Sequence, residues 1–172
     1  MTARKSRRKL KIAVIFMPVS EIRPPVSLTG LAVSGDLVMD EIARRLARSH
    51  DVIAYCSRGE HQQKVEQLDG VEYRRMSTSL DRWFSSHHRR IMRLIDHVWR
   101  RNAPQPIFNS SLWFRQFIGE VVADPQLQNC DIVHIMNMSQ FVPFVRRRAP
   151  RARIVLHMHC QWLERFDAAA IE

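Results

Sequence analysis

The chain has 172 residues and a net charge of +10, from 27 Lys and Arg against 17 Asp and Glu. Its 45% apolar and 26% charged residues exclude a disordered tail and predict one folded domain with a hydrophobic core. No apolar run approaches the roughly 20 residues of a membrane-spanning helix. Three Cys without metal-type spacing favour a reduced, cytoplasmic protein.

Strands and helices alternate through the first half of the chain. The segment Lys11–Met17 is short and rich in Ile and Val, which predicts a buried strand. Three prolines predict a loop over Pro18–Leu31, and long connections of this kind are often functional. Apolar residues at helical spacing predict a helix over Asp36–Arg48. Two further strands are predicted at Val52–Cys56 and, after an Asp-Gly turn signal, at Val71–Arg75.

The second half continues the alternation. Apolar residues at i, i+3, i+4 and i+7 predict a helix over Ile91–Val98, and a second helix is predicted over Leu112–Val122. The remaining predicted elements are a strand at Asp131–Met136, a helix capped by Ser139 that ends at Arg148, a strand at Arg153–His159 and a helix over Gln161–Ile171.

This order of elements predicts an α/β fold, a Rossmann-like open parallel sheet with helices on both faces. We expect a basic disordered arm over residues 1–10 and the folded domain over residues 11–172. In open sheets of this class, ligands bind beyond the carboxyl ends of the strands, where the strand order reverses. The rule selects the segments after Met17, His134 and Leu156 as candidate sites.

Basic residues are clustered in three places: an N-terminal arm over residues 4–11, a stretch over residues 82–101 and a group over residues 146–153. Such clusters suit an anionic partner, for example an acidic membrane surface or a phosphorylated ligand. They suit an ordinary solvated surface equally well. Nucleic acid is not expected as a partner, because the sequence has no basic motif interleaved with aromatic residues and no recognition-helix pattern.

The loop before the first predicted helix, Ser27–Asp36, is a candidate phosphate site. A helix N-terminus offers free N–H groups and a positive dipole end, and Gly30 and Gly35 would let the backbone approach a ligand. The loop matches neither the dinucleotide fingerprint nor the Walker motif. A plain connecting loop therefore remains the alternative.

Two polar residues stand out in the segment Asp131–Asn137. His134 alternates with apolar neighbours, so it is either a buried histidine with a backbone partner or a site residue. Asn137 follows the predicted strand, where its amide could form a turn or contact a ligand.

Two histidines mark the end of the last predicted strand. His157 and His159 would point to the same face of that strand. With Cys160 and His134 they could bind a metal, but a metal site needs a third strong ligand, and the sequence does not clearly supply one. A polar contact or a proton-transfer role suits a histidine near a strand end better.

Three segments carry a shared pattern: KIAVIFMPVSEIRPP at Lys11–Pro25, DEIARRLARSHDVIAYCS at Asp40–Ser57 and DIVHIMNMSQFVPFVRRRAPRARIVLHMHCQWL at Asp131–Leu163. The third is the most specific, with a strand, "H-x-x-N", "V-P-x-x-R-R", a second strand and "H-x-H". In this order they resemble the N-terminal half of family 4 glycosyltransferases, which are retaining enzymes of GT-B architecture. The resemblance implies an acceptor-binding domain that is truncated at its C-terminal end.

The implied function is transfer of a sugar from a nucleotide-diphosphate sugar to a glycan or lipid-linked acceptor, with no metal or other cofactor. The donor-binding half would be a separate partner, so the chain alone would be inactive, in the cytoplasm or at the inner face of the membrane. The implied site residues are His159 and then His157 for catalysis, Asn137, His134 and Gln140 for the acceptor, and Gly30 and Gly35 for the donor phosphates. A non-catalytic binding module and a histidine-based metal-dependent hydrolase remain the alternatives.

Overall fold

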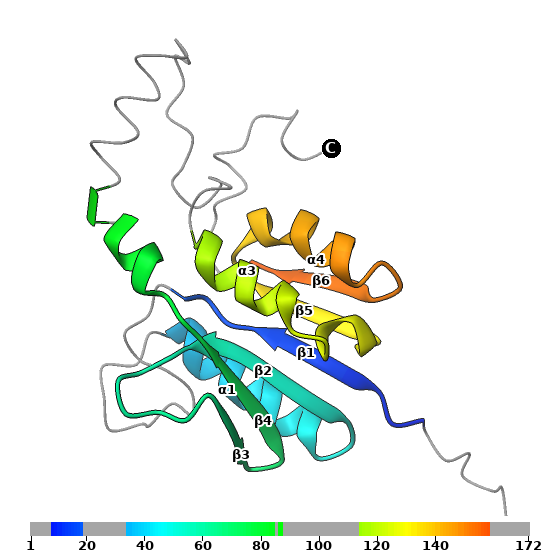
Figure 1. The fold of residues 1–172 in the computed structure, drawn as a ribbon. Coiled ribbons are helices and arrows are strands. Elements are labelled where there is room, and N and C mark those ends of the chain that lie inside the picture. Colours follow the sequence, from blue (N-terminus) through cyan, green and yellow to red (C-terminus); the bar gives the residue numbers. More distant parts are fainter. Residues whose placement is uncertain (1–7, 19–33, 85, 88–113, 159–172) are drawn as a thin grey trace, which may run out of the picture.

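The computed structural model describes residues 8–18, 34–84, 86–87 and 114–158. Within them, six strands form one sheet with the order β3-β4-β2-β1-β5-β6 (Figure 1). The strands are β1 (Lys11–Ile15), β2 (Asp51–Ser57), β3 (Val65–Leu68), β4 (Val71–Met76), β5 (Ile132–Met136) and β6 (Arg153–His157). Neighbouring strands are parallel except β3 and β4, which are antiparallel. The predicted α/β fold with a Rossmann-like open sheet is therefore confirmed.

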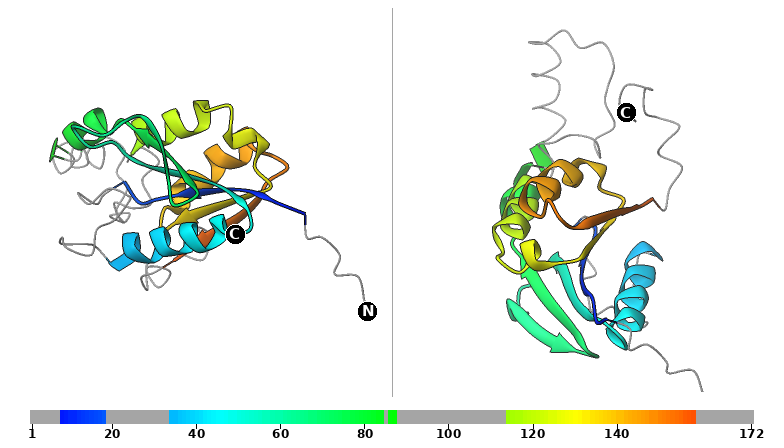
Figure 2. Two further views of the ribbon diagram at one scale, coloured as in Figure 1. Left: turned by 90° about the horizontal axis from the view of Figure 1, so that it is seen from below. Right: turned by 90° about the vertical axis from the view of Figure 1, so that its right-hand side faces the viewer.

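Helices cover both faces of this sheet, as predicted. They are α1 (Ser34–Ala47), α3 (Arg115–Ala123) and α4 (Val142–Arg148). Figure 2 shows α1 on one face and α3 and α4 on the other. Successive residues of β1 point to opposite faces, so Val14 packs in the core under α1, while Ala13 and Ile15 pack in the core under α3 and α4. Burial on both faces explains why β1 and β2 are nearly continuous apolar runs.

The strand β3 is an element that the sequence pattern does not predict. It forms a hairpin with β4 through Asp69 and Gly70, whose φ angles are 49° and 80°. Two successive residues with positive φ are typical of the tight turns that match the twist of a hairpin. The predicted turn is therefore present, but it joins two strands where only the second is predicted.

The start of α3 is capped by a distant residue. Phe114 precedes the helix with a left-handed φ of 56° and gives no side-chain cap. The carboxylate of Asp81 instead accepts hydrogen bonds from the N–H groups of Gln116 at 3.0 Å and Phe117 at 2.8 Å. In return, Gln116 Oε1 accepts a hydrogen bond from the N–H of Leu80 at 2.9 Å. Since residues 79–84 are helical, the starts of two helices satisfy each other's free N–H groups.

Two predicted boundaries are wrong. The helix predicted from Ser139 begins as a 3-10 turn, η3 (Ser139–Phe141), and Ser139 lies inside that turn without capping it. The residue before the turn is Met138, and α4 then ends at Arg148 as predicted. The last strand ends at His157 and does not include Met158.

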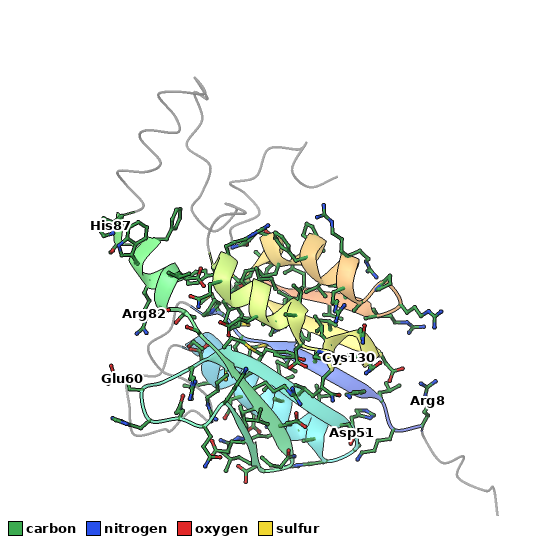
Figure 3. The ribbon with its side chains drawn as sticks, viewed as in Figure 1. Arg8, Asp51, Glu60, Arg82, His87 and Cys130 are labelled. Atoms are coloured by element: carbon green, nitrogen blue, oxygen red, sulfur yellow. The ribbon has the colours of Figure 1, made fainter. Side chains whose placement is uncertain are left out.

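Some predictions fall on residues outside the described part. These are the helices over residues 91–98 and 161–171 and most of the loop over residues 18–31. Of the arm over residues 1–10, Arg8 forms an ion pair with Asp131 at 3.0 Å, and Lys9 forms one with Asp51 at 2.6 Å. Arg8 and Asp51 lie at the same end of the sheet (Figure 3). None of the helices in the described part combines the length and the apolar composition needed to cross a bilayer.

Candidate functional site at the carboxyl ends of the strands

Strand β1 marks the point where the strand order reverses. From β1 the chain passes through α1 to β2 on one side, whereas β5 and β6 extend the sheet on the other side. The carboxyl ends of β1 and β5 therefore flank the position at which open α/β sheets bind ligands. Met17 follows β1, Asn137 follows β5 and His157 ends β6, so these residues come from three adjacent strands.

Asn137 links the three strand ends. Its backbone N–H donates a hydrogen bond to the carbonyl of His157 at 2.8 Å, and its side-chain Nδ2 donates to the sulfur of Met17 at 3.7 Å. Its φ of 53° is left-handed, a conformation that asparagine adopts more readily than most residues. The predicted turn role is therefore present. Because a thioether is a weak acceptor, a ligand could replace Met17 as the partner of the Asn137 amide.

His134 and His157 form a stacked pair on neighbouring strands. Their ring centroids are 5.3 Å apart with an angle of 14° between the ring planes. The strand register pairs Val14 with His134 and His134 with Val155, so the two histidines lie on the face of the sheet that carries α1. Val155 is 46% exposed on that face, which leaves the β5–β6 end of the face accessible within the described part of the chain.

The environment of His134 holds its ring neutral. Burial and the nearby His157 lower the pKa of His134, because both disfavour its charged form. A neutral imidazole has one donor and one acceptor nitrogen. The Nε2 atom of His134 is buried and has no hydrogen-bond partner in the described part of the protein. His134 is therefore a buried histidine whose ring could still take part in a hydrogen bond.

Gln140 places an unsatisfied amide oxygen close to the end of β5. The residue lies in η3 and is 8% exposed. Its Nε2 donates to the sulfur of Met138 at 3.5 Å, whereas its Oε1 is buried and has no donor among the described residues. A buried acceptor without a donor costs about 1–3 kcal/mol. A hydroxyl group of a ligand would relieve that cost.

Gly35 brings the start of α1 against the end of β5. A Cβ atom on Gly35 would lie 2.8 Å from the terminal methyl carbon of Met136, so the missing side chain permits this contact. The register pairs Met136 with His157, so Met136 lies between Gly35 of α1 and His157 of β6. The visible role of Gly35 is helix–strand packing. Gly30 and His159, the other predicted residues of this region, lie outside the described residues.

Asp36 is a residue of this region that the sequence patterns do not select. It lies in the first turn of α1 and is 2% exposed. An acidic side chain there is stabilised by the helix dipole, but an ionised carboxylate would compete with a phosphate for the same N–H groups. The sequence feature that could have identified Asp36 is its position directly after Gly35, at the end of the segment predicted to bind phosphate.

The described residues give no support to a metal centre. Among them, no group of three or more His, Cys, Asp and Glu side chains is placed to share an ion. Cys56 and Cys130 are buried, and burial raises the pKa of Cys130 to about 11, so its thiol is neutral at physiological pH. Cys160, the third cysteine, lies outside the described part.

No known family model and no curated protein sequence matches this chain.

Proposed function

We propose that this chain is the acceptor-side domain of a sugar transferase of the retaining GT-B type. The observation that carries the proposal is the bridge formed by Asn137, which ties the carboxyl ends of β1, β5 and β6 together. It supports an acceptor site because it holds a polar amide at the switch point of the sheet, next to the strand end that carries His157. A sugar could be held there by several uncharged hydrogen bonds.

The acceptor in this proposal is a glycan or a lipid-linked sugar. Its hydroxyl groups need both donors and acceptors, and the site offers the Gln140 Oε1, the Asn137 amide and the neutral His134 ring. Holding the acceptor hydroxyl against the anomeric carbon of the donor would turn a bimolecular step into an intramolecular one. His159 would face the reacting sugar, as in the family that the chain resembles, with His157 as the second candidate.

The donor would be a nucleotide-diphosphate sugar, with its phosphates against the loop that contains Gly30 and Gly35. Asp36 favours a second function, because its buried carboxyl lies at the helix terminus on which those phosphates would bind. A non-catalytic module that binds a glycan but not a nucleotide sugar agrees with this acidic terminus.

Sugar titrations followed by NMR test the acceptor site. We expect a panel of mono- and oligosaccharides to shift the backbone amide signals of Asn137 and His157. Asn137→Gly removes the side chain without straining the left-handed backbone, and it should weaken sugar binding about tenfold, or about 1.4 kcal/mol. Asn129→Gly, at the exposed last position of η2 (Leu127–Asn129), is the matched control and should leave binding unchanged. If no sugar of the panel shifts these signals, the acceptor proposal is wrong.

Calorimetric titration with nucleotide-diphosphate sugars tests whether the donor site lies within this chain. We expect this chain alone to bind them more weakly than the micromolar range, as an acceptor-side domain should. Micromolar binding would put the donor site within these residues and would exclude the non-catalytic module. Labelled-sugar transfer to an acceptor that shifts Asn137 would establish the enzyme directly.

A further inference from the structure

A second hollow lies at the carboxyl ends of β2 and β4. Its volume is about 480 Å³, and it lies between the end of β4 and the last turn of α3. Basic residues of the strands and loop line one side and carboxylates of the helix line the other; they are Arg58, Lys64, Arg74, Arg75, Glu120 and Asp124. None of the described residues of the candidate acceptor site is among those that line it. The size is typical of pockets that bind small molecules.

The inner cations of this hollow are already neutralised. Arg74 lies 2.5 Å from Glu72 and 2.7 Å from Asp124. Arg75 is fully buried and lies 2.7 Å from Glu66. The ion pairs of Arg74 hold the floor of the hollow in place. The Arg75 guanidinium instead lies over the Tyr73 ring, on the face of the sheet that carries α1, so its charge is directed away from α3. Both arginines therefore leave little charge for a ligand in the hollow.

Glu120 is held by neutral donors. Its Oε2 accepts a hydrogen bond from the N–H of Ser77 at 2.8 Å, and its Oε1 accepts one from Gln116 Nε2 at 3.3 Å. A carboxylate has about four acceptor positions, so Glu120 keeps capacity for hydroxyl groups of a ligand.

Arg58 and Lys64 carry charges that no carboxylate of the described residues neutralises. Arg58 Nε donates to the carbonyl of Gln62 at 3.2 Å, which leaves its two terminal nitrogens for another partner. Glu60 belongs to the same loop between β2 and β3 (Figure 3), yet it forms no ion pair with Arg58 or Lys64 in the described part. The uncompensated charge in this hollow is therefore positive.

Backbone hydrogen bonds fix these two residues on either side of β4. The N–H of Arg58 donates to the carbonyl of Met76 at 2.9 Å, and the N–H of Arg75 donates to the carbonyl of Lys64 at 2.8 Å. Because neighbouring strands lie about 4.8 Å apart, the two backbones are separated by about 10 Å. Both side chains are long enough to reach one anionic group between them.

We propose that this hollow binds a small phosphate monoester with a hydroxylated body. The Arg58 guanidinium would bind two phosphate oxygens, and the Lys64 ammonium would complete the neutralisation of the dianion. Glu120 would accept hydrogen bonds from hydroxyl groups, and Met76 and Ala123 supply apolar wall for the carbon skeleton. This inference does not depend on the proposed sugar-transfer function, since the two sites share no described residue.

Titration with glucose 6-phosphate, orthophosphate and glucose tests the proposal. We expect saturable binding of glucose 6-phosphate with shifts of the Arg58 and Ser77 amide signals, weaker binding of orthophosphate and none of glucose. The double variant Arg58→Ala with Lys64→Ala should bind glucose 6-phosphate at least tenfold more weakly. The control Arg147→Ala with Arg151→Ala removes the same charge from exposed positions elsewhere and should change binding less than twofold.

Glu120→Gln separates the two halves of the proposed ligand. It should weaken binding of glucose 6-phosphate several-fold and leave orthophosphate unchanged, because only the hydroxylated body uses Glu120. Equal losses in the two double variants would mean that general positive charge attracts the anion, and the proposal would be rejected. Absence of saturable binding by the unsubstituted chain would reject it as well.

Discussion

The hydroxyl of Tyr73 donates a hydrogen bond of 2.6 Å to Asp40 Oδ1 inside the protein. Tyr73 is on β4 and Asp40 is on α1, and Arg44 reaches the other carboxylate oxygen of Asp40 at 2.9 Å. Arg44 also contacts Asp69 in the β3–β4 turn at 3.0 Å. One network, buried at Tyr73 and Asp40 and exposed at Asp69, therefore fixes α1 against the hairpin.

Removing the Tyr73 hydroxyl should destabilise the protein. Tyr73→Phe leaves Asp40 with one partner fewer in a buried position, so we expect a loss of about 1–3 kcal/mol in the free energy of unfolding. The matched control is Tyr55→Phe. Tyr55 is also fully buried, but its hydroxyl has no hydrogen-bond partner among the described residues, so its removal should be neutral or stabilising. Urea unfolding measures both, and equal losses would contradict the network.

The cap that Asp81 provides to α3 can be tested in the same way. Asp81→Ala frees the N–H groups of Gln116 and Phe117 at a buried helix start, and we expect a loss of about 1–2 kcal/mol. Asp51→Ala is the control, because the Asp51 side chain is 60% exposed and pairs only with the exposed Lys9; its loss should be below about 0.5 kcal/mol. An Asp81 variant as stable as the Asp51 variant would show that α3 does not need this cap.

The low pKa of His134 makes the stability depend on pH. Well above pH 6.5 neither the folded nor the unfolded chain protonates this ring, and the full stability is present. As the pH falls below 6.5, the unfolded chain takes up the proton first, so the free energy of unfolding decreases. Unfolding at about pH 8 and about pH 5.5 should show this loss, and His134→Gln should reduce it. His61→Gln, in an exposed loop, should retain it.

The neighbouring His157 contributes electrostatically to the lowered pKa of His134. Its contribution can be measured separately from that of burial. His157→Gln removes the electrostatic effect of the neighbouring imidazole, so the pKa of His134 should rise toward its ordinary value. NMR titration of the His134 ring signals follows this directly. An unchanged or lower pKa in the variant would mean that burial alone sets the state of His134.

In an active transferase form, the two predicted catalytic histidines should differ. The resemblance to glycosyltransferases predicts that His159→Ala slows sugar transfer strongly, whereas His157→Ala costs less. Turnover with a labelled nucleotide sugar measures both, with thermal unfolding as the check that each variant folds. The reverse order of effects would exchange the two roles.

The sequence indicates the sheet well because its central strands are buried on both faces. β1, β2 and β5 lie close to their predicted ranges, since such strands read as apolar runs. β6 also starts where predicted, because it too is an apolar run, although it is the last strand of the described sheet and is half-exposed. β3 escapes prediction because Val65 and Gln67 are exposed on an edge strand, so its four residues show no apolar pattern. The capping of α3 by Asp81 is also invisible locally, because donor and acceptor are 35 and 36 residues apart.

The same limit applies to the candidate site. His134, Asn137 and His157 stand out because polar residues at the end of an apolar strand are unusual in the sequence. Their mutual contacts, such as the stacking of His134 on His157, depend on the register between β5 and β6. Arg58 and Lys64 belong to no recognisable sequence motif. They come together because their backbones lie on opposite sides of β4, which their spacing in the sequence does not reveal.

The reciprocal capping joins Leu80 and Asp81 to Gln116 and Phe117, which are 35 or 36 residues away in the sequence. The free energy of bringing two such positions together depends only logarithmically on the number of residues between them, at about 0.6 kcal/mol for each doubling. The free energy of closing this contact should therefore change little with the number of residues between Asp81 and Gln116, provided that both are kept.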